Sequence, residues 1–160
     1  MCRSTTKREN TVLSFLVAFS VVLVVLATPV GAQTFTFTAM LNSGQEVPPN
    51  TSRALGVAFV TFNAATLEVC FSISYEDFNL TSPETAAHFH FPAPPGVNAP
   101  VRINLPAGAP KNGCATADPP LTIQDITDLF SGRWYINIHT EMNPGGEIRG
   151  QVLPQAAPVF

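Results

Sequence analysis

The sequence predicts an all-β fold, an antiparallel sandwich or barrel of about seven or more strands with one short helix. Apolar and polar residues alternate at period two in most of the apolar runs, which is typical of half-buried strands. Clusters of proline, glycine and asparagine separate these runs at short intervals. Only one stretch in the second half of the chain has helical spacing, so the helix content is expected to be small.

The first half of the chain contains four predicted strands, at 35–41, 56–62, 67–75 and 86–91. The third is the clearest, because Val69, Phe71 and Ile73 alternate strictly with other residues. Residues 63–66 (Asn-Ala-Ala-Thr) are expected to join the second and third strands as a hairpin. The proline-rich and glycine-containing loop 92–100 ends the fourth.

The second half contains three further predicted strands, at 101–105, 133–140 and 147–153. We expect residues 106–120, which include Cys114, to form a long irregular segment. A helix is predicted over 123–130, since Thr122 can cap its first turn and Gly132 can end it. The turn 143–146 (Asn-Pro-Gly-Gly) is expected to join the last two strands as a hairpin.

The first 32 residues are expected to be a secretory signal peptide. Basic residues precede an apolar run at 12–27, and small residues at 28–32 provide a cleavage site after Ala32. Cleavage leaves one domain at 33–153 and a C-terminal tail at 154–160. The protein is then expected to be secreted or held in the cell envelope, in an extracellular or periplasmic location. The alternative is a retained N-terminal anchor, because the apolar run nearly reaches the length that spans a membrane.

The composition after residue 32 narrows the range of partners. Five basic and ten acidic residues remain and no basic patch is visible, so nucleic acid is not an expected partner. No later segment is long and apolar enough to span a membrane. Two cysteines remain, Cys70 and Cys114, which in an oxidising compartment either pair in a disulfide or stay as separate thiols.

All three histidines fall in two strand-like phrases, 87–90 (Ala-His-Phe-His) and 135–140 (Tyr-Ile-Asn-Ile-His-Thr). Residues two apart in a strand share a face, so His88 and His90 point the same way, and His139 lies opposite the apolar side of its own strand. If the two strands are neighbours, the three imidazoles converge and can bind copper or zinc with one coordination position open. The alternative is that they are structural and hydrogen-bond to loop carbonyls or carboxylates.

Ligand histidines normally need partners that orient their rings. Judged by the motifs in which they stand, the candidate carboxylates for this role are Glu46, Glu141 and Glu147. Asn137 shares a strand face with His139 and is a further candidate for a structural or supporting group.

A second polar group lies near the C-terminal end. Glu147, Arg149 and Gln151 share one strand face, which we interpret as the solvated face of an edge strand or as structural and supporting groups. For Glu46 three roles are open: an ion pair with Arg149, support of the histidines, or cover for a turn. The ion pair is favoured.

These phrases together resemble the CHRD domain, a module found in chordin and also alone in secreted bacterial proteins. The resemblance runs from about residue 35 to 152 and depends on ordered phrases: 41–49 (Leu-Asn-Ser-Gly-Gln-Glu-Val-Pro-Pro), Gly56, 86–90 (Ala-Ala-His-Phe-His), 96–101 (Gly-Val-Asn-Ala-Pro-Val), the helix with Gly132, 135–140 and 146–151 (Gly-Glu-Ile-Arg-Gly-Gln). Pro92 and Ala99 stand where the family usually has glycine.

The resemblance implies an immunoglobulin-like β-sandwich or barrel, and residues 88–90 look like the His-x-His copper ligands of copper/zinc superoxide dismutases. The bridging histidine and zinc-site aspartate of those enzymes are not evident, so dismutase activity is not expected. The sequence also lacks a Gly-x-Ser-x-Gly phrase and a phosphate-binding loop. The leading expectation is a non-enzymatic binding module with an extracellular protein partner. The alternative is a mononuclear copper or zinc protein, with or without redox activity.

Overall fold

A computed structural model describes residues 33–155 of the chain. The predicted signal peptide lies outside these residues, as does most of the predicted C-terminal tail. The described part is all-β with one short helix, which confirms the predicted fold class. Its strands are β1 (Thr34–Asn42), β2 (Leu55–Asn63), β3 (Glu68–Tyr75), β4 (Glu84–His90), β5 (Val101–Asn104), β6 (Lys111–Ala115), β7 (Trp134–Thr140) and β8 (Ile148–Pro154).

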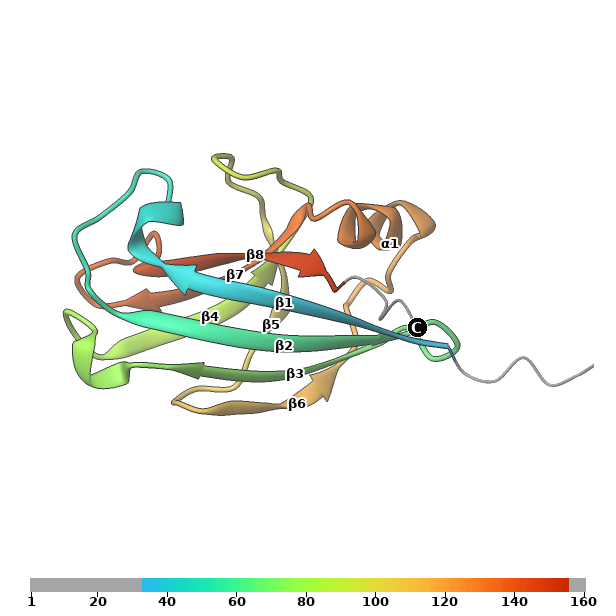
Figure 1. The fold of residues 1–160 in the computed structure, drawn as a ribbon, viewed down its shortest axis with the longest axis horizontal. Coiled ribbons are helices and arrows are strands. Elements are labelled where there is room, and N and C mark those ends of the chain that lie inside the picture. Colours follow the sequence, from blue (N-terminus) through green and yellow to red (C-terminus); the bar gives the residue numbers. More distant parts are fainter. Residues whose placement is uncertain (1–32, 156–160) are drawn as a thin grey trace, which may run out of the picture.

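The eight strands form one antiparallel sheet in the order β5-β4-β7-β8-β1-β2-β3-β6. The sheet curls strongly, so that strands far apart in this order face each other across the core (Figure 1). The ring of Phe71 on β3 lies 6.1 Å from the ring of Phe89 on β4. At the rim, the Lys111 ammonium on β6 lies 2.6 Å from a carboxylate oxygen of Glu84 on β4. The result is a nearly closed, barrel-like sheet.

Period-two burial holds well on β3, where Val69, Phe71 and Ile73 are buried and the intervening side chains are more exposed. The two central strands β7 and β8 differ, because loops cover their outer face and both faces are buried. Arg149 and Gln151 on β8 are therefore buried, and β8 lies between β7 and β1. The interpretation of this strand as a solvated edge was wrong.

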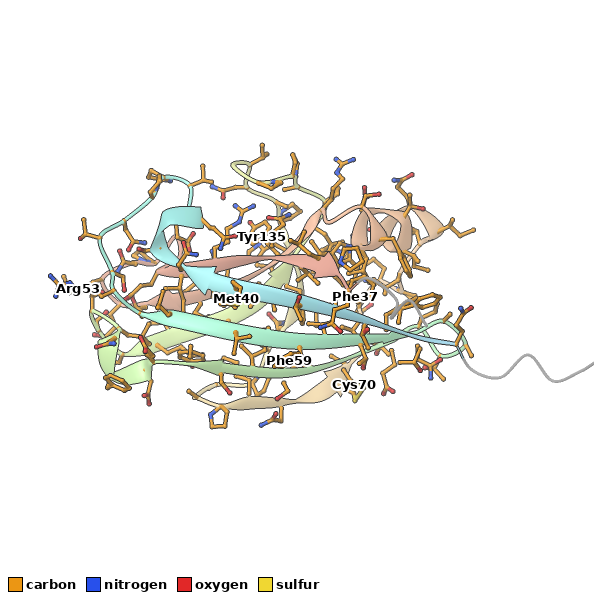
Figure 2. All side chains as sticks on the ribbon, in the orientation of Figure 1. Phe37, Met40, Arg53, Phe59, Cys70 and Tyr135 are labelled. Atoms are coloured by element: carbon orange, nitrogen blue, oxygen red, sulfur yellow. A yellow bond between two sulfur atoms is a disulfide. The ribbon has the colours of Figure 1, made fainter. Side chains whose placement is uncertain are left out.

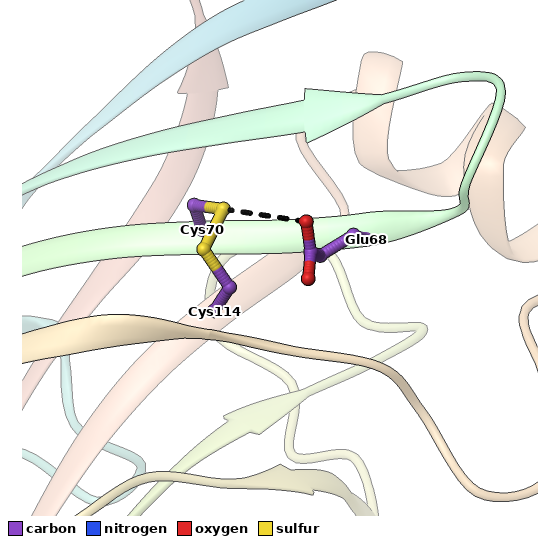
Figure 3. Close-up of a disulfide and its surroundings, with 3 residues drawn as sticks. All are labelled: Glu68, Cys70 and Cys114. Carbon is purple, nitrogen blue, oxygen red and sulfur yellow. Dashed lines mark hydrogen bonds between the residues drawn. A yellow bond between two sulfur atoms is a disulfide. The ribbon is translucent and has the colours of Figure 1, made fainter.

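The predicted irregular segment 106–120 contains the edge strand β6, which corrects that expectation. Pairing with β3 holds this strand in register, and it places Cys70 directly opposite Cys114. The two residues form a disulfide across the pair (Figure 3). A link between residues 44 apart in sequence stabilises the fold by about 4 kcal/mol in the chain-entropy model. Glu68 approaches the Cys70 sulfur at 3.9 Å, but bonded sulfurs carry no proton and are poor metal ligands.

The predicted helix is α1 (Ile123–Phe130), and its start follows the capping box expected from Thr122. The Thr122 hydroxyl accepts from the Asp125 amide, and the Asp125 carboxylate accepts from the Thr122 amide. The helix packs at one end of the barrel, where the Phe130 ring contacts Phe35 and Phe37 of β1. Within residues 33–155, no helix has the length and apolar character needed to cross a membrane.

The outward face of β1 and β2 carries exposed apolar side chains. Figure 2 shows Met40 and Phe59 on this face, and 67% and 55% of their surfaces are exposed. A shallow apolar hollow lies beside Met40 and is lined mainly by Leu55, Gly56 and Val57. This hollow is separate from the polar, loop-covered face of β7 and β8. That face carries the side chains that could bind a ligand or a metal ion.

Candidate metal centre

The three histidines lie on two neighbouring strands. His88 and His90 belong to β4 and His139 to β7, and the strands pair with Ala86 opposite His139 and His90 opposite Tyr135. The apolar residues next to the histidines along each strand, Phe89 on β4 and Ile138 on β7, point into the core. The imidazoles therefore share the outer face of the sheet, as period-two alternation requires for adjacent strands.

The imidazoles are close enough to share one ion. The centroid of the His88 ring lies 4.9 Å from that of His139 and 5.5 Å from that of His90, and the His90 and His139 centroids are 5.9 Å apart. One ring nitrogen from each residue lies within 4.8 Å of the other two. Metal bonds of about 2.0 Å place ligand nitrogens roughly 3.3–3.5 Å apart, so a small closing movement of the rings completes the geometry.

Backbone carbonyls fix the protonation of two of the rings. His90 Nδ1 lies 2.9 Å from the Ala99 carbonyl oxygen, and His139 Nδ1 lies 2.9 Å from that of Pro144. Because a carbonyl oxygen only accepts hydrogen bonds, Nδ1 carries the proton in each ring, and Nε2 keeps its lone pair. Metal-binding histidines have this arrangement.

Three buried ring nitrogens find no hydrogen-bond partner among residues 33–155: His88 Nδ1, His90 Nε2 and His139 Nε2. A buried polar atom without a partner is costly, and such atoms call for a physical explanation. Here each of the three converging rings contributes one such nitrogen. Three imidazole nitrogens are a donor set that suits zinc or copper. The donors in the structure therefore fit such an ion.

The histidines are held in the neutral form that binds metals. Burial lowers the pKa of all three below the usual value of 6.5. The shift is largest for His90, whose pKa falls to about 4 through burial, through its two histidine neighbours and through the charge of Arg149. At neutral pH a metal ion therefore meets mainly unprotonated rings and displaces few protons from them.

The groups that orient the rings differ from those expected. Sequence reasoning selected carboxylates, whereas the carbonyls of Ala99 and Pro144 hold His90 and His139. Glu141 is exposed. Carbonyl partners leave no pattern in the sequence, because any residue type supplies one. The loop resemblance at 96–101 was the only indication for Ala99.

Glu46 reaches over the same face from the loop after β1. Asn137, opposite His88 on the neighbouring strand, donates its Nδ2 to both carboxylate oxygens of Glu46, at 3.1 and 3.0 Å. Burial raises the Glu46 pKa to about 7, against the lowering effects of the Asn137 hydrogen bond and the Arg149 charge. Gly146 (φ +130°) packs against both side chains, and a Cβ there would overlap Asn137.

The favoured ion pair between Glu46 and Arg149 was wrong. Within residues 33–155 the ion pairs at 4.0 Å or less are Arg102–Asp125, Lys111–Glu84 and Arg133–Asp128. Glu46 and Arg149 instead line the same cavity, of about 400 Å³. Their charges act on each other through space, without the close contact that the sequence suggested.

Glu147 has a structural role away from the imidazoles. Glu147 is fully buried. Its carboxylate accepts hydrogen bonds at 2.6–2.8 Å from the hydroxyls of Ser52, Thr81 and Thr140. It also accepts from the Thr81 backbone amide and the Asn143 side-chain amide. Although burial raises its pKa, these bonds hold it below the usual value. Glu147 therefore joins the loops around residues 52, 81 and 143 to the sheet.

An aromatic stack beside the cluster has no counterpart in the sequence-based predictions. The His90 ring lies parallel to the Tyr135 ring, with centroids 4.7 Å apart and planes 2° apart. The guanidinium carbon of Arg149 lies 3.5 Å from the Tyr135 centroid. Figure 2 marks Tyr135 beside β8, and its hydroxyl accepts from the Ala99 amide at 3.1 Å. Ala99 thus anchors both rings of the stack.

Comparison with known proteins gives one family. The model of the CHRD domain matches residues 37–152, which covers most of the chain. No curated protein and no solved structure matches. The matched range includes all three histidines, both cysteines of the disulfide, and the loops that cover β7 and β8.

Proposed function

This chain belongs to the CHRD-domain family, and on that premise we propose that its domain binds one copper or zinc ion through His88, His90 and His139. The domain then acts as a binding module whose ligand is a metal ion. The predicted signal peptide and the Cys70–Cys114 disulfide support an oxidising compartment outside the cytosol.

One observation carries the proposal: three buried imidazole nitrogens from two adjacent strands lack hydrogen-bond partners within the described chain. Structural histidines would use both ring nitrogens in hydrogen bonds, as buried polar groups normally do. In His90 and His139 the Nδ1 atoms are satisfied and the Nε2 atoms are left for a ligand. Three nitrogen donors leave a coordination position for water or a further ligand.

We expect the purified domain to bind one equivalent of copper or zinc at pH 7 with a dissociation constant well below micromolar. Calorimetric titration of chelator-treated protein measures both quantities. The lowered pKa values of the histidines predict little proton release, so the binding enthalpy should depend only weakly on the ionisation enthalpy of the buffer. Millimolar or absent binding of both ions contradicts the proposal.

A further inference from the structure

Arg149 places a positive charge beside the histidine cluster. The Tyr135 ring separates this guanidinium from the His90 ring, because β7 lies between β4 and β8 in the sheet. The three groups form a continuous stack, in which a positive charge lies one aromatic ring away from a metal-binding imidazole. Arginine favours this geometry, since its planar cation stacks on aromatic faces.

The Arg149 charge is buried and has no close counter-ion. Only 1% of the residue is exposed, and no carboxylate within residues 33–155 lies in ion-pair contact with it. Its nitrogens donate to neutral oxygens instead: Asn98 Oδ1 and Gln151 Oε1 at 3.3 Å and the Pro94 carbonyl at 3.4 Å. Buried charges are screened less than exposed ones, so this charge acts strongly on its surroundings.

We infer that Arg149 sets the metal preference of the cluster, favouring copper(I) over copper(II) and zinc(II). This inference depends on the proposed function. A fixed positive charge repels a divalent ion twice as strongly as a monovalent ion at the same distance. Three neutral imidazoles supply no negative ligand to offset that difference. Asn137 holds the Glu46 carboxylate by two hydrogen bonds, so Glu46 is not itself a ligand in this arrangement.

The stack holds the Arg149 guanidinium beside the His90 ring, because both groups lie against the Tyr135 ring. A metal ion bound at His90 therefore experiences the field of this charge, with an effect that scales with the charge of the ion. Arg149 is thus a positioning and specificity-determining residue that does not itself contact the ion.

The test compares copper(I) and copper(II) affinities, each measured by competition with a chromophoric chelator, and the copper reduction potential by voltammetry. Arg149→Gln is expected to strengthen copper(II) binding about tenfold relative to copper(I), which lowers the potential by about 59 mV. Arg149→Lys keeps the charge and should return the ratio close to that of the parent protein. Arg133→Gln, which removes an equal charge from a half-exposed site, is the matched control and should change neither value.

Glu46→Gln gives an independent result of opposite sign. At pH 8 this substitution removes a negative charge, so the potential should rise. If Arg149→Gln does not fold, an unchanged or lowered potential in Glu46→Gln shows that a charge in the cavity shared with Arg149 does not act on the ion, and this overturns the inference. An unchanged affinity ratio in a folded Arg149→Gln protein, or a fall in potential for Glu46→Gln, overturns the inference and leaves the metal site standing. Failure of the parent protein to bind copper(I), copper(II) and zinc(II) alike refutes the proposed function itself.

Discussion

Replacement of His139 by alanine is expected to weaken copper or zinc binding by at least about 100-fold. Removal of a partner that only orients a ligand already costs roughly 10–100-fold in metal affinity. His139 is one of three donors, and it is the single donor from β7, so its loss reduces the cluster to the His-x-His pair on β4. Competition titration with a chelator of known affinity measures the change.

The matched control is Glu141→Gln, which alters an exposed side chain two residues along the chain. It should leave metal affinity unchanged, because Glu141 has no contact with the imidazoles. Thermal unfolding of the chelator-treated His139→Ala protein should remain close to that of the parent, since the substitution removes one hydrogen bond to the Pro144 carbonyl. Equal metal affinity in the folded variant and the parent would rule out His139 as a ligand.

Glu147→Gln is expected to lower the free energy of unfolding by about 3 kcal/mol at pH 7, because hydrogen bonds to a charged acceptor contribute about 1.5–3 kcal/mol each and several depend on this carboxylate. Glutamine keeps the size of the side chain but loses the charge and turns one acceptor into a donor. Its NH₂ group then faces the hydroxyls of Ser52, Thr81 or Thr140, which already donate. Urea unfolding measures the difference.

The effect of Glu147 should depend on pH in a defined direction. Its folded-state pKa lies below the usual value of 4.5, so the carboxylate stabilises the fold above that value. This contribution is lost as the pH falls through the folded-state pKa. The difference between parent and Glu147→Gln should therefore be full at pH 7 and shrink towards pH 3. A difference that stays constant over this range would show that packing, and not charge, is the cause.

Period-two alternation predicted most of the fold and the histidine face. Phe89 and Ile138 point inward, and this alone requires the adjacent histidines to point outward together. Strand β6 escaped prediction because its short sequence (Lys-Asn-Gly-Cys-Ala) has no alternating pattern. Its conformation comes from pairing with β3 and from the disulfide, which are contacts between segments distant in sequence.

The surroundings of the histidines were harder to predict than the histidines themselves. The polar face of β8 suggested an exposed edge, because the sequence does not reveal that the loops after β1 and β4 cover it. The favoured Glu46–Arg149 pair failed for a related reason. Asn137 holds the Glu46 carboxylate, while Arg149 stacks on Tyr135. Which of several polar partners makes contact depends on loop geometry that no local pattern encodes.

X-ray absorption at the copper or zinc edge tests the central claim most directly, because it reports the ligands of the bound ion. For protein loaded with one equivalent, we predict three imidazole nitrogens at about 2.0 Å and no sulfur ligand. The His139→Ala protein, loaded at a concentration high enough to force binding, should show two imidazoles. A parent spectrum with only oxygen ligands, or with a single imidazole, would contradict a metal centre formed by His88, His90 and His139.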